Sequence, residues 1–146
     1  MITIVHGDIL QTQARALVNP VNTEGVMGAG LALAFKRRFP AMFAEYRAMC
    51  LDKRLDIGDL HFYEPKDGPL IINFPTKRLW RNPSRIEYIT AGMGRLLEVI
   101  EDYQLPSLAI PALGCGKGGL NWKDVSAILV AALAPLSTEC FLYPPQ

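Results

Sequence analysis

Two glycine-rich segments constrain the fold of this chain most. Each lies between a strand-like run and a helical pattern. The first segment reads NPVNTEGVMGAGLALAF after a run at 16–19, and the second reads GCGKGGLNW after a run at 108–113. Glycines in such a turn let backbone N–H groups approach a phosphate, and the helix that follows begins with a partial positive charge. A tight strand-to-helix connection explains either segment alone equally well. The pair in one small chain favours a site that grips a diphosphate from both sides.

Strand-like and helix-like patterns alternate along the chain. Short runs rich in β-branched and aromatic residues predict six strands, at 2–5, 16–19, 60–63, 70–74, 108–113 and 139–143. Apolar residues spaced three and four apart predict helices around 96–103 and 125–132, and two more helices divided by Pro40 precede the third strand. This alternation indicates an α/β sandwich, in which ligands bind at the carboxyl ends of the strands.

The chain length and charge balance limit the organisation and the partners. With 146 residues, no internal repeat and no Gly/Ser linker, the sequence predicts a single domain over residues 1–146. The 15 Lys and Arg residues nearly balance the 14 Asp and Glu residues, so any contact with nucleic acid must be local. Three widely spaced cysteines, no signal-peptide pattern and no apolar stretch of bilayer length predict a cytoplasmic protein with no zinc site and no membrane span. We expect a monomer.

Several polar residues stand where the predicted strands end. Asp8 follows the first strand, where its carboxylate suits the exocyclic amine of a base, although capping of a turn is the alternative. Asn19 and Asn22, which we place at the mouth of the first glycine segment, offer the donor and acceptor that a sugar diol needs, and Asx turns explain them equally well. Cys115 has no identifiable base, so we interpret it as a small loop residue rather than a nucleophile.

Neither common phosphate-binding signature fits the glycine segments. A P-loop requires Ser or Thr after its Gly-Lys pair, whereas Gly116-Lys117 is followed by Gly118. The Rossmann fingerprint GxGxxG requires a third glycine where this chain has Leu33. The sequence therefore disfavours a nucleoside triphosphatase and leaves dinucleotide binding as a distant alternative.

The order of motifs resembles the macrodomain family over essentially the whole chain. The motifs are Gly7-Asp8-Ile9 after the first strand, VNPVN at 18–22, the glycine-rich loop into a helix, and PALGCGKGGL at 111–120. Macrodomains bind ADP-ribose, so the resemblance implies an α/β fold that is a three-layer α/β/α sandwich with a mixed central sheet of about six strands. Within the family, NFPTK at 73–77 and GCGKGGLNW at 114–122 are similar to the branch of the terminal ADP-ribose protein glycohydrolase and the DarG antitoxins.

The resemblance also implies roles for individual residues. Asp8 would bind the adenine amine, and the backbone of Ile9 would contact the ring edge. Asn22, supported by Asn19, would lie near the distal ribose. Tyr143 would pack against the adenine, with a place in the core or rim as the alternative. The other ligand-binding residues are Thr76 and the two loops whose backbone N–H groups would bracket the diphosphate: Gly28, Ala29, Gly30, Leu31, Gly114, Cys115, Gly116, Lys117, Gly118, Gly119 and Leu120.

Lys77 matches the catalytic lysine of that branch. As the free amine it would attack C1 of the distal ribose and form a Schiff base, and as the ammonium it would stabilise the leaving group. We rank the nucleophile first, which requires that desolvation or the neighbouring cation-rich segment lowers the pKa of the lysine. Without the resemblance, Lys77 is a solvated loop lysine. The resemblance implies no metal and no cofactor, with ADP-ribose as ligand and product.

Departures from related branches favour a DNA substrate. The chain lacks the GGGVD run of MacroD-type hydrolases and the paired glutamates of poly(ADP-ribose) glycohydrolases, and KGG at 117–119 stands where the terminal glycohydrolase has a catalytic aspartate. The resemblance thus implies removal of ADP-ribose from DNA bases by an antitoxin whose partner is a DarT-type toxin. Arg78, Trp80 and Arg81 suit single-stranded DNA, and arginines paired with surface carboxylates are the equal alternative.

Two other functions stay open at this point. A non-catalytic reader of ADP-ribose would have the same pocket without turnover, and only Lys77 separates it from the enzyme. A hydrolase of ADP-ribosylated glutamate or aspartate, or of O-acetyl-ADP-ribose, would keep the lysine and change the substrate.

Overall fold

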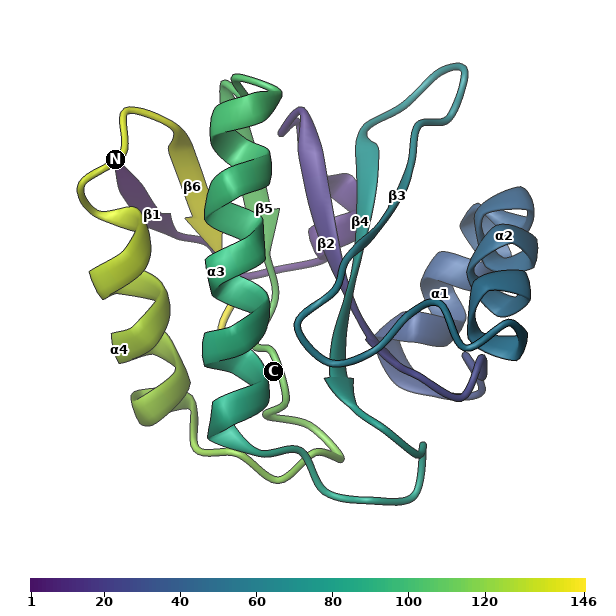
Figure 1. Cartoon of the computed structure of the whole chain (residues 1–146). Coiled ribbons are helices and arrows are strands. Elements are labelled where there is room, and N and C mark those ends of the chain that lie inside the picture. Colours follow the sequence, from purple (N-terminus) through teal and green to yellow (C-terminus); the bar gives the residue numbers. More distant parts are fainter.

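A computed structural model describes all 146 residues as a mixed six-stranded sheet between two layers of helices (Figure 1). The strands are β1 (Ile2–Ile4), β2 (Ala16–Asn22), β3 (His61–Tyr63), β4 (Leu70–Lys77), β5 (Ser107–Ile110) and β6 (Glu139–Leu142). The helices are α1 (Gly30–Arg38), α2 (Pro40–Leu51), α3 (Ile86–Asp102) and α4 (Trp122–Leu133), with a short 3₁₀ helix at Ile9–Gln11. The predicted three-layer α/β/α sandwich is confirmed.

The strand order brings most of the strand ends to one edge of the sheet. The order is β1-β6-β5-β2-β4-β3, and the first five strands are parallel to one another. Only β3 is antiparallel, paired with β4. The carboxyl ends of β1, β6, β5, β2 and β4 therefore follow one another along a single edge.

Each face of the sheet has its own hydrophobic core. Along β2 the side chains alternate, so Ala16 and Val18 belong to the core under α3 and α4, while Leu17 belongs to the core under α1 and α2. Figure 1 shows α3 and α4 running side by side over one face, with α1 and α2 as a separate pair. Because both faces of the sheet are covered, its central strands are buried along almost their whole length.

Local signals place the helix ends correctly. Pro40 occupies the first turn of α2, where its missing N–H is not needed, and it separates α1 from α2 as predicted. The Asn121 side chain accepts the N–H of Lys123 at 2.8 Å and caps α4. No helix has the length and the apolar character that crossing a bilayer requires.

The strand bounds differ from the prediction where they affect the site. β2 continues to Asn22 instead of ending at Asn19, and β4 continues to Lys77 instead of ending at Phe74, because these two strands pair along this whole length. In contrast, β5 ends at Ile110, before a proline that has no N–H for the ladder. Asn19 therefore lies inside the sheet rather than at a loop mouth, and Lys77 ends a strand.

Candidate functional site

A cavity of about 1240 Å³ lies along the edge formed by the carboxyl ends of the five parallel strands. Its lining includes residues 7–9 after β1, 143–146 after β6, 111–112 and 114–118 after β5, and 28–32 at the start of α1. It ends at Thr76, Lys77 and Trp80 beside β4. Neighbouring strands are about 4.8 Å apart, so five strand ends span roughly 19 Å. The cavity thus suits an elongated ligand with two different ends and a middle held by glycine loops.

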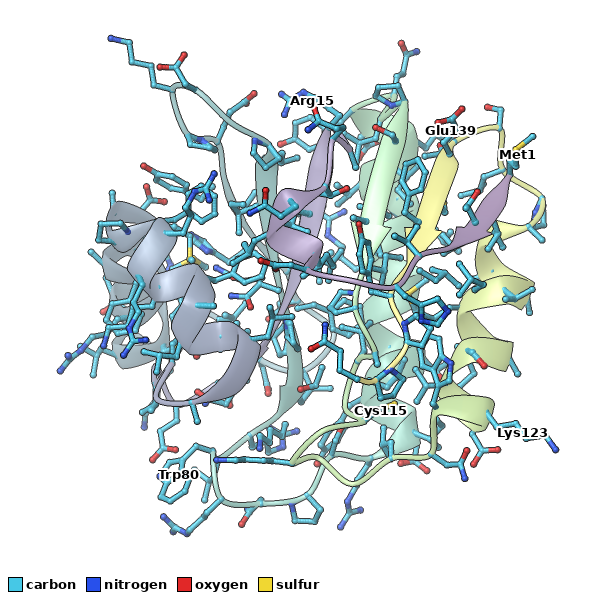
Figure 2. All side chains as sticks on the ribbon, turned by 180° about the vertical axis from the view of Figure 1, so that it is seen from behind. Met1, Arg15, Trp80, Cys115, Lys123 and Glu139 are labelled. Atoms are coloured by element: carbon cyan, nitrogen blue, oxygen red, sulfur yellow. The ribbon has the colours of Figure 1, made fainter.

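Figure 2 places this edge on the molecule. Cys115 and Trp80, which line the cavity, lie at the end of the molecule opposite Arg15 and Glu139. Those two residues stand near the amino ends of β2 and β6. The cavity therefore lies at the end of the sheet opposite the amino ends of these strands.

The β1 end of the cavity offers a carboxylate beside an aromatic ring. Asp8 is exposed, and its Oδ1 accepts the N–H of Leu10 at 2.9 Å, which caps the 3₁₀ helix. Its Oδ2 makes no hydrogen bond within the chain and stays available to a ligand donor. Tyr143 is half-buried against the core under α1 and α2, and it lines the cavity. The Gln146 amide donates to the Gly7 carbonyl at 3.0 Å and brings the last residues to this end.

Asn22 organises the first glycine loop through its side chain. Its Oδ1 accepts the N–H groups of Glu24, Gly25 and Val26 at 3.1, 3.0 and 3.2 Å, and its Nδ2 donates to the Val26 carbonyl at 2.8 Å. These bonds form the Asx-type turn that the sequence left as one of two interpretations. Asn22 also lines the cavity, where the second hydrogen of its amide nitrogen is still unused.

Asn19 does not line the cavity, in contrast to the expectation that it supports Asn22 near the ribose. It is fully buried, and its Nδ2 donates to Asn73 Oδ1 at 3.0 Å, while its own Oδ1 has no partner. Asn73 Nδ2 lies 3.0 Å from His61 Nδ1, and His61 Nε2 lies 3.3 Å from a carboxylate oxygen of Glu45. Asn19, Asn73 and His61 are direct cross-strand neighbours in β2, β4 and β3. This polar row holds three strands in register inside the core.

The second glycine loop folds tightly against the chain that follows β4. A Cβ atom on Gly118 would lie 2.6 Å from the Gly114 carbonyl oxygen and 3.0 Å from the Cβ of Ser84. Gly114 and Gly119 adopt φ of +72° and +80°, which favour glycine. Residues 114–118 line the cavity, whereas Gly119 and Leu120 do not, because Gly119 turns the chain away and Leu120 packs against the core. The predicted phosphate loop therefore ends at Gly118.

Cys115 lies in the cavity lining but lacks thiolate character. Burial raises the pKa of its thiol to about 11, and no histidine stands in the lining to act as a base. The interpretation of Cys115 as a small loop residue agrees with these surroundings. No three His, Cys, Asp or Glu side chains gather where they would hold a metal ion.

Lys77 stands at the β4 end of the cavity, in surroundings that disfavour its charged form. It is half-buried, and its Nζ donates to the Trp80 carbonyl at 2.8 Å. Burial lowers the pKa of Lys77, and the positive charge of Lys117 lowers it further. Of the two causes that the sequence named, desolvation acts as expected, while the nearby cation comes from the second glycine loop instead of the segment after β4.

In the segment after β4, Arg78 forms an ion pair within the chain, whereas Trp80 and Arg81 stay exposed. Arg78 Nη1 lies 2.6 Å from a carboxylate oxygen of Asp56, its guanidinium lies 5.9 Å from the Tyr88 ring centre, and it does not line the cavity. For Arg78 the surface ion pair is therefore the interpretation that the structure supports. Trp80 is 53% exposed and lines the cavity, and Arg81 is exposed without an ion pair.

Residues outside the motifs hold the loops in place. The Thr23 N–H donates to the carbonyls of Lys77 and Arg78 at 3.2 and 3.1 Å, and the Trp80 N–H donates to Glu24 at 3.1 Å. These bonds fasten the loop after β2 to the segment after β4. Sequence reasoning missed them because an ordinary Thr-Glu pair carries no signal of its partners in the fold.

Tyr46 and Ser84 also support the two glycine loops, and the sequence did not predict this. Tyr46 lies on the buried face of α2 with Met42 and Cys50, and its hydroxyl bonds to Asn22 in the first glycine loop. Ser84 lies in no motif, yet it is buried between the end of β4 and the second glycine loop. The one sequence signal for Tyr46 is its hydroxyl, which stands among apolar residues on the buried face of α2.

Comparison with known proteins decides the family. Residues 18–129 match the family model described as Macro domain. The chain belongs to the macrodomain family. This macrodomain is 47% identical to the DNA ADP-ribosyl glycohydrolase of Mycobacterium tuberculosis, over 100% of this chain and 43% of that protein. It is 42% identical to the Thermus aquaticus protein of the same name, over 99% of this chain and 41% of the relative. The chain thus spans less than half the length of these relatives.

Solved structures agree with the fold of this macrodomain. The macrodomain of Mycobacterium tuberculosis DarG superimposes with a TM-score of 0.97 at 47% identity, covering 100% of this chain and 99% of that one. Thermosipho africanus DarTG in complex with ADP-ribose gives a TM-score of 0.93 at 34% identity, covering 99% of this chain and 41% of that one. The family and branch that the motifs indicated are therefore confirmed.

Proposed function

We propose that this macrodomain hydrolyses the bond between ADP-ribose and a modified DNA base. The observation that carries this proposal is the position of Lys77, half-buried with a lowered pKa at the last strand end of an elongated cavity. A reader module needs the cavity alone, whereas a nucleophilic amine also needs surroundings that lower the pKa of the lysine. The 47% identity to a DNA ADP-ribosyl glycohydrolase over the whole of this chain supports the same activity.

The cavity suggests how ADP-ribose lies. The adenine occupies the β1 end, where the free Asp8 oxygen accepts its amine and Tyr143 packs on the ring. The diphosphate lies between residues 28–31 and 114–118, against backbone N–H groups and the start of α1. The distal ribose then reaches Asn22 and the β4 end.

At that end Lys77 acts as the nucleophile. Its neutral Nζ attacks C1 of the distal ribose, a C–N bond forms, and the bond from C1 to the base breaks as the base takes up a proton. Loss of the amine proton and opening of the sugar ring give a Schiff base. Water then hydrolyses this bond, which releases ADP-ribose and restores the free amine. The reaction needs no metal and no cofactor.

The remaining surroundings support a nucleic-acid substrate and a toxin partner. Trp80 and Arg81 stand exposed beyond Lys77, where a ring stacks on an unpaired base and a guanidinium meets a phosphate. A relative from Thermosipho africanus, 33% identical, is named a DNA ADP-ribosyl transferase-DNA ADP-ribosyl glycohydrolase fusion protein. We therefore propose single-stranded DNA as the carrier of the substrate, a DarT-type transferase as the partner, and a cytoplasmic monomer as the working form.

Turnover on defined substrates tests the proposal. Single-stranded oligonucleotides ADP-ribosylated on thymine or guanine, and a peptide ADP-ribosylated on glutamate, are incubated with wild type, Lys77→Ala and Lys123→Ala. Lys123 is an exposed lysine in α4 outside the cavity and serves as the control. We expect wild type and Lys123→Ala to release ADP-ribose from DNA. We expect Lys77→Ala to bind free ADP-ribose but not to cleave it from DNA.

The other outcomes assign the alternatives. Release from the peptide alone would identify a hydrolase of ADP-ribosylated acidic side chains. ADP-ribose binding without turnover on any substrate would identify a reader module. Borohydride reduction during turnover separates the two roles of Lys77, because only the nucleophile leaves a stable adduct of the sugar on its Nζ.

A further inference from the structure

The tight turn after β4 leaves both backbone groups of Trp80 without a partner inside the turn. The N–H of Asn82 closes this turn by donating to the carbonyl of Leu79 at 3.1 Å. Trp80 and Arg81 are its two central residues, so the closing bond uses neither the N–H nor the carbonyl of Trp80. Both groups bond to side chains from outside the turn.

The two side chains that bond to Trp80 come from the ends of neighbouring strands. The Trp80 carbonyl accepts a hydrogen bond from Nζ of Lys77 at 2.8 Å, and the Trp80 N–H donates to Oε2 of Glu24 at 3.1 Å. Lys77 ends β4, whereas Glu24 lies in the first glycine segment, after β2. The N–H of Thr23 donates to the carbonyls of Lys77 and Arg78, so the segment after β2 is fixed against the turn.

The Glu24 side chain makes this one hydrogen bond only. Glu24 is half-buried and forms none of the ion pairs of the chain. Its own N–H donates to Oδ1 of Asn22 at 3.1 Å, which fixes the backbone from which the carboxylate reaches the turn. The acceptor for the Trp80 N–H is therefore held in place by the same Asn22 oxygen that organises the first glycine loop.

Trp80 offers two different groups to the reaction. Its ring is 53% exposed and lines the cavity, and Figure 2 shows it at the same end of the molecule as Cys115. Its carbonyl holds the amine of Lys77. A residue has only two soft backbone dihedrals, so fixing the N–H within a closed turn also restricts the carbonyl and the direction of the ring.

We propose that Glu24 is a positioning residue: it holds the backbone of Trp80 so that the carbonyl orients Nζ of Lys77 and the ring faces a base of the DNA. This inference rests on the proposed glycohydrolase function. It makes the orientation of the nucleophile and the recognition of the base depend on one residue of the turn, and it assigns a part in the reaction to a carboxylate outside the cavity lining.

Turnover of single-stranded oligonucleotides ADP-ribosylated on thymine or guanine tests this role. We expect Glu24→Ala to lower kcat about 10- to 100-fold, because the nucleophile is misplaced, while the calorimetric affinity for free ADP-ribose stays that of wild type. Glu24→Gln keeps an oxygen that accepts the Trp80 N–H and retains the wild-type kcat. Glu139→Ala, at an exposed position at the opposite end of the molecule, is the matched control (Figure 2). A wild-type kcat in Glu24→Ala, or an equal loss in Glu24→Gln and Glu24→Ala, overturns the proposal.

The fluorescence of Trp80 tests the contact without turnover. The chain has two tryptophans, and Trp122→Phe leaves Trp80 as the only one while keeping a ring against the core. In this background we expect Glu24→Ala to lower the anisotropy of Trp80 and to increase its quenching by acrylamide, whereas Glu24→Gln matches the parent. Unchanged fluorescence in Glu24→Ala overturns the role of Glu24. Changed fluorescence together with no turnover by wild type on any substrate overturns only the glycohydrolase proposal.

Discussion

The Tyr46 hydroxyl lies 2.7 Å from the backbone oxygen of Asn22 and 2.8 Å from its Oδ1, so helix α2 directly supports the first glycine loop. Tyr46 is fully buried, and burial raises the pKa of its phenol, which keeps the hydroxyl hydrogen in place as a donor. The Asn22 oxygen that it reaches also gathers three loop N–H groups. The conformation of the first glycine loop thus depends on a helix residue 24 positions further along the chain.

Replacing Tyr46 by Phe removes this support and keeps the ring. We expect a loss of stability of about 1 kcal/mol, the usual net contribution of one hydrogen bond. We also expect weaker ADP-ribose binding, because the loop must then be ordered by the ligand. Urea denaturation and calorimetric titration measure the two effects. Tyr63→Phe, whose hydroxyl has no partner in the chain, is the matched control. Equal affinity of Tyr46→Phe and wild type would show that the loop keeps its shape without the hydroxyl.

Trp80→Ala separates DNA recognition from ADP-ribose recognition. Stacking of one base on an aromatic ring contributes about 1–3 kcal/mol, so we expect the affinity for ADP-ribosylated single-stranded DNA to fall about 5- to 150-fold. Affinity for free ADP-ribose changes less, because Lys77 bonds to the backbone of Trp80 and not to its ring. Fluorescence anisotropy measures both ligands. Arg78→Ala, which loses a guanidinium already paired with Asp56, has the smaller effect on DNA. A larger loss for Arg78→Ala than for Trp80→Ala would contradict the assignment.

His61 makes the stability of the fold depend on pH. Burial lowers the pKa of His61 below its ordinary value of 6.5, and the contact with Glu45 opposes this only in part. Below pH 6.5 His61 therefore takes up a proton in the unfolded chain before it does so in the folded chain. The free energy of unfolding falls as the pH decreases from 6.5 to the lower pKa of His61 in the folded state. His61→Gln reduces this slope, while His6→Gln, at an exposed position, leaves it unchanged. Urea unfolding from pH 5 to 8 gives the slopes. Equal slopes for His61→Gln and wild type would show that other groups cause the dependence.

Two glycines in α3 respond oppositely to the same substitution. A Cβ on Gly92 would lie 2.2 Å from the buried Phe74 ring, whereas a Cβ on Gly94 meets nothing within 4 Å. We expect Gly92→Ala to destabilise the protein by about 1–3 kcal/mol through overpacking. Gly94→Ala stabilises it by about 0.5–1 kcal/mol through helix propensity. Thermal unfolding compares both with wild type. A stable Gly92→Ala variant would mean that the contact between α3 and β4 adjusts easily.

The amino-acid sequence by itself determined the elements of this macrodomain and the position of its loops. Six strands, four helices, the break at Pro40 and the cap at Asn121 follow from periodicity and from the local preferences of proline and asparagine. The two glycine segments predict where a diphosphate binds, since glycine permits turns that other residues avoid. Such signals act within a few residues and need no knowledge of the fold.

Only the tertiary structure decided which side chains meet. The pairing of β2 with β4 carried both strands beyond their predicted ends, buried Asn19 in a row with Asn73, and brought Lys77 to the cavity edge. It also placed Ser84 between Thr76 and Gly118, where no motif indicated a contact. Hydrogen bonds and charge repulsion act over a few ångströms, and residues far apart in sequence come within that range only when the strands take their register.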